Sequence, residues 1–119
     1  MRIRASIFML LAVVANAAIA QNCKNPQTQL DMNVCSGRDF EREDKLLNKV
    51  YGELRSKLDA TEKEKLKNVQ VAWLKYRDLA CEYEGAQYEG GSMQPLVFSS
   101  CKATLTADRR KMLENLTKQ

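Results

Sequence analysis

The feature that most constrains this chain is a polar interruption in the apolar face of one predicted helix. Residues 69–81 contain the only tryptophan and end on a cysteine. At helical spacings of three and four, one face of this stretch collects apolar residues, namely Leu66, Val69, Trp73, Tyr76 and Ala80. Gln70 and Arg77 fall on the same face. Because an unpaired polar group in a protein interior is costly, the rest of the fold must supply partners for these two side chains.

The first twenty residues have the pattern of a signal peptide. Arg2 and Arg4 precede a short apolar run, and residues 18–20 read Ala-Ile-Ala, which fits a cleavage site. We therefore expect a mature single domain of residues 21–119 with one modest core, in the periplasm or secreted. Asn22 precedes Cys23, where a lipid-anchored chain needs a small residue, so we expect no membrane anchor in the mature protein.

All four cysteines lie in the predicted mature part: Cys23, Cys35, Cys81 and Cys101. An even number in an exported chain indicates two disulfides, for which three connectivities are possible. Zinc is the competing interpretation, but the chain has no C-x-x-C motif and no histidine. We expect no metal and no cofactor.

Two helices are predicted in the first half of the mature chain. Thr28 and Asp31 resemble a capping box that opens a short helix from 29 to about 35, which Ser36-Gly37 would end. A long amphipathic helix follows over about 39–58. Its stripe consists of Phe40, Asp44, Leu47, Tyr51, Leu54 and Leu58.

A second long helix is predicted after a turn at Asp59-Ala60. Thr61 and Glu64 form a capping box, so this helix begins at about residue 62. It runs to about residue 88 and ends at Gly90-Gly91.

Ser92 can cap a third helix, with Pro95 in its first turn. The apolar spacing of this helix is given by Val97, Cys101, Leu105, Met112 and Leu116. No segment shows the alternation of a strand. The predicted fold class is therefore all-α: an antiparallel helical hairpin in a three-helix arrangement, with a short N-terminal helix and two disulfides.

The short turn at 59–60 requires the two long helices to run antiparallel, which fixes the residues that lie at the same level. Asp44 then meets Arg77, Asn48 meets Trp73, and Tyr51 meets Gln70. We predict an Asp44–Arg77 ion pair; the alternative is that both side chains extend outward.

The same register, applied to a turn centred on Gly91, places Cys81 level with Cys101. Cys23 and Cys35 are left to pair. Their bond requires residues 23–28 to fold back along the first helix.

Catalytic chemistry is poorly provided for, so we predict that the protein is not an enzyme. Histidine is absent, the cysteines are expected to be bonded, and no nucleotide-binding or nucleophile motif occurs. A glutamate pair could act as in a glycosidase, but glutamates beside a surface loop are usually only solvated. Without Arg2 and Arg4 the net charge of +4 falls to +2, which does not favour nucleic acid.

The segment 82–95 is the best candidate for binding. From Asp78 to Cys101 the chain has no Lys or Arg but several acidic residues. Tyrosines beside small, flexible residues suit protein recognition. The alternative is that the segment only joins two helices. The candidate binding residues are Glu82, Tyr83, Glu84, Tyr88, Glu89, Gly90, Gly91 and Ser92.

Several motifs together resemble the LprI-type family. They are Cys23, Thr28 and Cys35; Asp44-x-x-Leu47-Asn48-x-x-Tyr51; Gln70-x-x-Trp73-Leu74-x-Tyr76-Arg77-Asp78-x-x-Cys81; and Gly90-Gly91-Ser92 with Cys101. The family consists of exported bacterial proteins and is named for a mycobacterial lysozyme inhibitor. The resemblance covers nearly all of the mature chain.

The resemblance implies an all-helical, disulfide-bonded fold with the pairs Cys23–Cys35 and Cys81–Cys101. It also points to a lysozyme or another muramidase as the first candidate partner. From the residues of the 82–95 loop, we expect this loop to occlude the active cleft of that enzyme. The inhibitor function belongs to one branch of the family. The alternative is therefore a structural or envelope-stress protein without an enzyme target.

Overall fold

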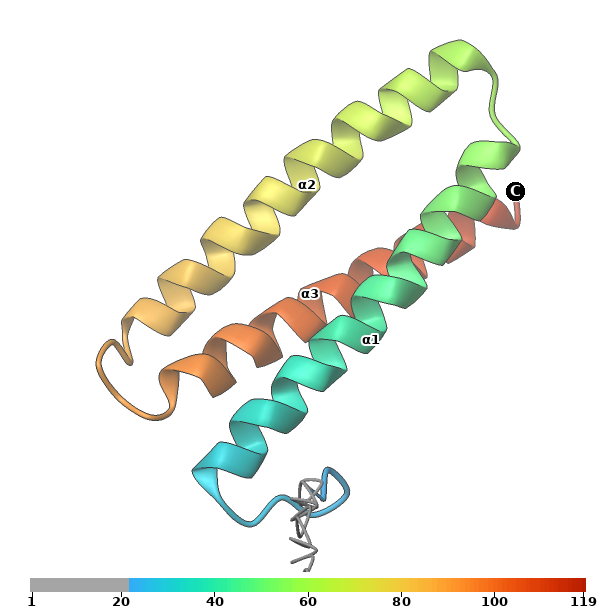
Figure 1. Ribbon diagram of the computed structural model, residues 1–119. Coiled ribbons are helices and arrows are strands. Elements are labelled where there is room, and N and C mark those ends of the chain that lie inside the picture. Colours follow the sequence, from blue (N-terminus) through green and yellow to red (C-terminus); the bar gives the residue numbers. More distant parts are fainter. Residues whose placement is uncertain (1–21) are drawn as a thin grey trace, which may run out of the picture.

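The structure, a computed structural model, describes residues 22–119 and contains three long helices there (Figure 1). They are α1 (Gln29–Ser56), α2 (Ala60–Ala86) and α3 (Gln94–Thr117). The described residues contain no strand, so the all-α prediction is confirmed. The predicted signal peptide, residues 1–20, lies outside the described residues. Between residues 22 and 119, no helix is both long and apolar enough to span a membrane.

The helix α3 is the main neighbour of both other helices. Figure 1 shows α1 and α3 running side by side in the same direction, while α2 runs back alongside them. Leu47, Val50 and Leu54 of α1 and Leu113 of α3 form the buried apolar core. From α2, Leu66 and Trp73 pack against this core. The core is small, so much of the remaining interior is filled by polar side chains and disulfides.

The predicted break at Ser36-Gly37 is wrong, because α1 continues through it as one helix of 28 residues. The cap at Thr28 is as expected: its hydroxyl accepts a hydrogen bond from the Asp31 amide at 3.0 Å. Ser36 is buried and donates its hydroxyl to the Asn33 carbonyl at 2.9 Å. This local bond keeps Ser36 compatible with a helix, and one glycine costs only about 1 kcal/mol in a helix interior.

The first turn lies about two residues earlier than predicted, between Ser56 and Ala60. Asp59, rather than Thr61, caps α2, and Glu62, rather than Glu64, completes the capping box. The Glu62 amide donates to the Asp59 carboxylate at 2.8 Å. Both pairs fit the capping pattern, because aspartate and threonine are both good N-caps.

The connection between α2 and α3 also differs in detail from the prediction. The helix α2 ends at Ala86, and Gly90 has a φ of +76°, which glycine adopts without strain. Ser92 does not cap α3; its carbonyl instead accepts a hydrogen bond from the Asn33 side chain of α1 at 3.0 Å. The connection is thereby attached to α1, 59 residues earlier in the chain.

Both predicted disulfides are present. Cys23–Cys35 has a Cα–Cα distance of 5.4 Å and folds residues 23–28 back against α1. Cys81–Cys101 joins α2 to α3 at a Cα–Cα distance of 5.5 Å. Cys35 and Cys81 are buried. The second bond holds together the end of the molecule that carries the candidate binding segment.

Candidate functional site

Arg77 is the centre of a polar cluster between the three helices. Its side chain is only 7% exposed. The guanidinium donates from Nη1 to Asp44 Oδ1 at 3.2 Å and from Nε to Asp78 Oδ1 at 2.9 Å. A third bond, of 3.3 Å, goes from Nη1 to the fully buried Thr106 hydroxyl of α3. The predicted Asp44–Arg77 pair is therefore confirmed, but it is one contact of a larger cluster.

Aromatic rings complete the surroundings of this cluster. The Arg77 guanidinium lies 5.0 Å from the ring centre of Phe40 and 5.3 Å from that of Trp73. Lys102 lies 4.3 Å from the Phe40 ring and 3.4 Å from the Asp78 carboxylate. Such cation–π contacts strengthen when they are removed from water. The cluster thus joins the three helices where the apolar core ends.

The predicted partner of Gln70 is wrong. Gln70 is buried, but its side-chain carbonyl accepts a hydrogen bond of 3.0 Å from Arg109 of α3. Tyr51 is half-buried and packs against the core, and no hydrogen bond joins it to Gln70 among the described residues. Asn48 is exposed, although Trp73, its predicted neighbour, does pack against the core. The helix α3 supplies the partner that the two-helix register assigned to α1.

The predicted apolar stripe of α3 is also displaced. Met112 and Leu116 are 57% and 47% exposed, whereas Thr106, Arg109 and Leu113 are buried. Burial lowers the pKa of Arg109. Sequence reasoning missed Thr106 and Arg109 because polar residues on a buried face give no hydropathy signal.

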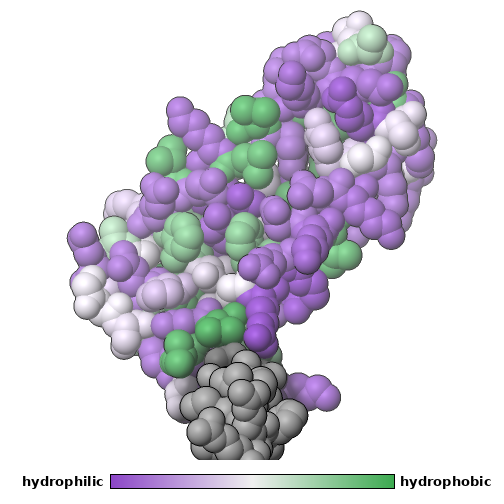
Figure 2. Space-filling view, in the orientation of Figure 1, coloured by the Kyte–Doolittle hydropathy of each residue, from purple (hydrophilic) through white to green (hydrophobic). Residues whose placement is uncertain are grey.

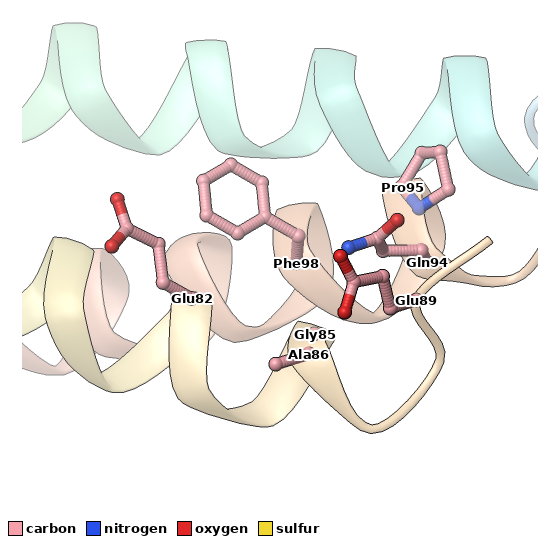
Figure 3. Close-up of a pocket in the computed structure, with 7 residues that line it drawn as sticks. All are labelled: Glu82, Gly85, Ala86, Glu89, Gln94, Pro95 and Phe98. Atoms are coloured by element: carbon pink, nitrogen blue, oxygen red, sulfur yellow. The ribbon is translucent and has the colours of Figure 1, made fainter.

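The candidate segment 82–95 forms the tip of the α2–α3 hairpin, called the tip below. A groove of about 490 Å³ opens on one side of it. Figure 3 shows Glu82 and Glu89 at this groove, with the Phe98 ring between α2 and the neighbouring α1. The lining residues are Glu82, Gly85, Ala86, Glu89, Gln94, Pro95 and Phe98. Two carboxylates border a largely apolar floor.

The other candidate residues lie away from this groove. Glu84 lines a second groove, of about 480 Å³, that is bordered by Leu96, Val97 and Cys101 of α3 among others. Tyr83 is 74% exposed and Tyr88 is 43% exposed. Gly90, Gly91 and Ser92 belong to the connection and line neither groove. The structure thus divides the predicted acidic segment between two sides of the tip.

The tip carries less free negative charge than the sequence indicates, because the Asp78 carboxylate pairs with Arg77 and Lys102. Burial alone would raise the pKa of Asp78, but its hydrogen bonds and charge contacts with Arg77 and Lys102 outweigh burial and hold that pKa below its usual value. Glu82, Glu84 and Glu89 take part in no ion pair among residues 22–119. These three glutamates carry the free negative charge of the tip.

Residues 22–119 offer no cluster of three His, Cys, Asp or Glu side chains able to hold a metal ion. All four cysteines are in disulfides. The two carboxylates at the groove of the tip, Glu82 and Glu89, give it the chemistry to bind a cationic group.

Comparison with known proteins identifies the family. The family model described as "Lysozyme inhibitor LprI" matches residues 20–113. An uncharacterized protein of Rhizobium meliloti (strain 1021) is 35% identical, over 93% of this chain and 90% of the relative. No solved structure matches the chain. The chain belongs to the lysozyme inhibitor LprI family.

Proposed function

We propose that the protein is an exported inhibitor that binds a lysozyme or another muramidase with the tip of its α2–α3 hairpin. Its membership of a family named for lysozyme inhibition supports the class of partner. The observation that carries the proposed site is the groove in which Glu82 and Glu89 border the apolar Phe98. The protein would act by occupying the enzyme's cleft and not by catalysis.

A lysine or arginine of the enzyme is the side chain that fits this groove. Its charged end would pair with Glu82 and Glu89, and its aliphatic stem would lie on Phe98 and Pro95. Charge-assisted hydrogen bonds of this kind are stronger than neutral ones. Lysozymes of the animal type are basic, so the free glutamates of the tip would also accelerate their association with the protein.

The tip is held in place before binding. Cys81–Cys101 joins the two helices that carry it, and Asn33 of α1 bonds to the Ser92 carbonyl. A surface that is already ordered loses less conformational entropy on association. This restraint favours a role as a rigid plug over that of a mobile linker.

Export is part of the proposal, with residues 1–20 as the signal peptide and 21–119 as the mature domain. The two disulfides support a periplasmic or secreted location, because such bonds persist in oxidising compartments. No membrane anchor is proposed for the mature protein.

A lysis assay tests the proposal. The purified protein should slow the clearing of a cell-wall suspension by lysozyme at stoichiometric concentration. Glu89→Lys should weaken this inhibition by about tenfold or more, because juxtaposed like charges cost a few kcal/mol. The matched control is Glu53→Lys, at an exposed position in the last turn of α1. Figure 1 shows that this end of α1 lies at the opposite end of the molecule from the α2–α3 connection, so the inhibition by this variant should equal that of the wild type.

Other outcomes would overturn the proposal in distinct ways. Lysis that proceeds unchanged at every ratio of protein to enzyme would favour a structural or envelope-stress role. Clearing of the suspension by the protein alone would indicate an enzyme. Equal effects of Glu89→Lys and Glu53→Lys would exclude the tip as the binding surface.

A further inference from the structure

The helix α2 carries an uncovered apolar row on the side opposite its buried residues. Gln70, Arg77 and Cys81 of this helix are buried against the rest of the molecule. The exposed row alternates spacings of three and four and consists of Val69, Ala72, Tyr76, Leu79, Tyr83 and Ala86. This is the a/d spacing at which two helices pack along a common seam.

The row is exposed to an extent that calls for a partner. Val69, Tyr76, Leu79 and Tyr83 have 55%, 60%, 54% and 74% of their surface exposed. Figure 2 shows hydrophobic residues over α2 at the surface of the molecule. From side-chain sizes we estimate on the order of 600 Å² for the row, so two copies together would approach the roughly 1,200 Å² of a specific interface.

We propose that this row is the interface of an antiparallel homodimer in which the α2 helices of two copies pack about a two-fold axis. The axis would pass between the two α2 helices, at the level midway between Arg77 and Asp78, which is the midpoint of the row. Tyr76 then faces Leu79 of the second copy, Ala72 faces Tyr83, and Val69 faces Ala86. Each alanine is opposite a larger residue, so the two rows can interdigitate.

Charge favours a second copy of the chain as the occupant. Lys75 and Glu82, seven residues apart, flank the row on the same side, so antiparallel packing brings Lys75 of each copy beside Glu82 of the other. The start of α2 has a net charge of only +1, because Lys63, Lys65 and Lys67 lie beside Glu62 and Glu64, and the acidic tip follows the other end of the helix. Antiparallel packing sets this weakly basic end of each copy beside the acidic tip of the other, whereas parallel packing would set the two acidic tips side by side.

The dimer does not depend on the proposed inhibitor function. Glu82 and Ala86 line the acidic groove and also border or belong to the row. A second copy and a basic enzyme would therefore compete for part of the same surface. Sedimentation of the protein without any enzyme therefore tests the dimer alone, and lysozyme binding is measured separately.

Sedimentation equilibrium of the purified protein tests the dimer. The wild type should show a reversible monomer–dimer equilibrium. Leu79→Lys should weaken the dimer by about tenfold or more, because it would place two unpaired ammonium groups in the seam. The matched control is Met112→Lys: Met112 is 57% exposed on α3, outside the row, and its substitution should leave the equilibrium unchanged.

A charge swap tests the antiparallel register. Lys75→Glu and Glu82→Lys should each weaken the dimer, and the double variant should restore it. A wild type that remains monomeric at every accessible concentration would overturn the proposal, as would equal effects of Leu79→Lys and Met112→Lys. Failure of the double variant to restore association would refute the antiparallel pairing. If a monomeric wild type loses lysozyme binding on Leu79→Lys, the row belongs to the enzyme and not to a second copy.

Discussion

Truncation of Arg77 to alanine should destabilise the protein by about 3–5 kcal/mol, the range measured when one partner of a buried charged cluster is removed. The side chain is 7% exposed and makes hydrogen bonds to all three of its polar neighbours, Asp44, Asp78 and Thr106. Its guanidinium also makes cation–π contacts with the Phe40 and Trp73 rings.

The contributions can be ranked from the exposure of each partner. Thr106 is fully buried, so its hydroxyl loses a partner without gaining water, at about 1–3 kcal/mol. The carboxylates of Asp44 and Asp78 are 37% and 45% exposed and can be rehydrated, so they contribute less. By the same reasoning Asp44→Ala should cost only about 1–2 kcal/mol, because Arg77 retains its other two partners.

Urea unfolding of the oxidised protein, followed by far-UV circular dichroism, measures these values. The double variant of Asp44 and Arg77 should show a coupling energy of about 1 kcal/mol. The control is Arg42→Ala: its pair with Asp39 is 60% and 53% exposed, so its loss should cost at most about 1 kcal/mol. The reasoning is refuted if Arg77→Ala is as mild as Arg42→Ala, or if Asp44 and Arg77 are additive.

Three further predictions concern the bond at the tip, the core and acid stability. Replacing Cys81 and Cys101 by serine should cost about 3 kcal/mol in urea unfolding and weaken lysozyme inhibition; unchanged inhibition would mean that the tip needs no restraint. Leu113→Ala, at a fully buried site, should cost about 2–5 kcal/mol, and a loss below about 1 kcal/mol would contradict its place in the core. Because the pKa of Asp78 is depressed in the folded protein, its stabilisation is complete above the ordinary value of 3.8 and is lost as the pH falls through the lower folded value. Asp78→Asn should therefore flatten the acid limb of the stability profile, and a profile parallel to that of the wild type would contradict this.

The features that sequence reasoning captured are those with an unambiguous local or pairwise signal. Asp44 and Arg77 are charged residues on apolar stripes, so each needs a partner of opposite charge. The predicted register of the two helices places them at the same level. The cysteine pairs follow from the level of Cys81 and Cys101 across the glycine turn. An arginine side chain is long, so the ion pair forms even though the turn lies two residues earlier than the register assumed.

The features that the sequence did not predict correctly are those for which two local patterns are equally acceptable. In these places the tertiary structure decides which pattern is used. Thr61 and Asp59 are both valid caps, and a single Gly37 permits either a helix break or a continuous helix. The inward face of α3 carries Thr106 and Arg109, which hydropathy assigns to the surface. Only the position of Arg77 and Gln70 on α2 explains their burial, because each bonds to one of these two.

The apolar residues of α2 lie on two different faces of the helix, whereas the sequence predicted a single stripe. The predicted single stripe is split: Leu66 and Trp73 pack inward, whereas Val69 and Tyr76 are exposed. The inward face is polar at Gln70 and Arg77 because the neighbouring helices offer hydrogen-bonding partners there. A helix with a polar inner face and an apolar outer row cannot be stabilised mainly by burial within its own chain. Cys81–Cys101 and the Arg77 cluster hold α2 in place, which leaves its outer row available for a second copy.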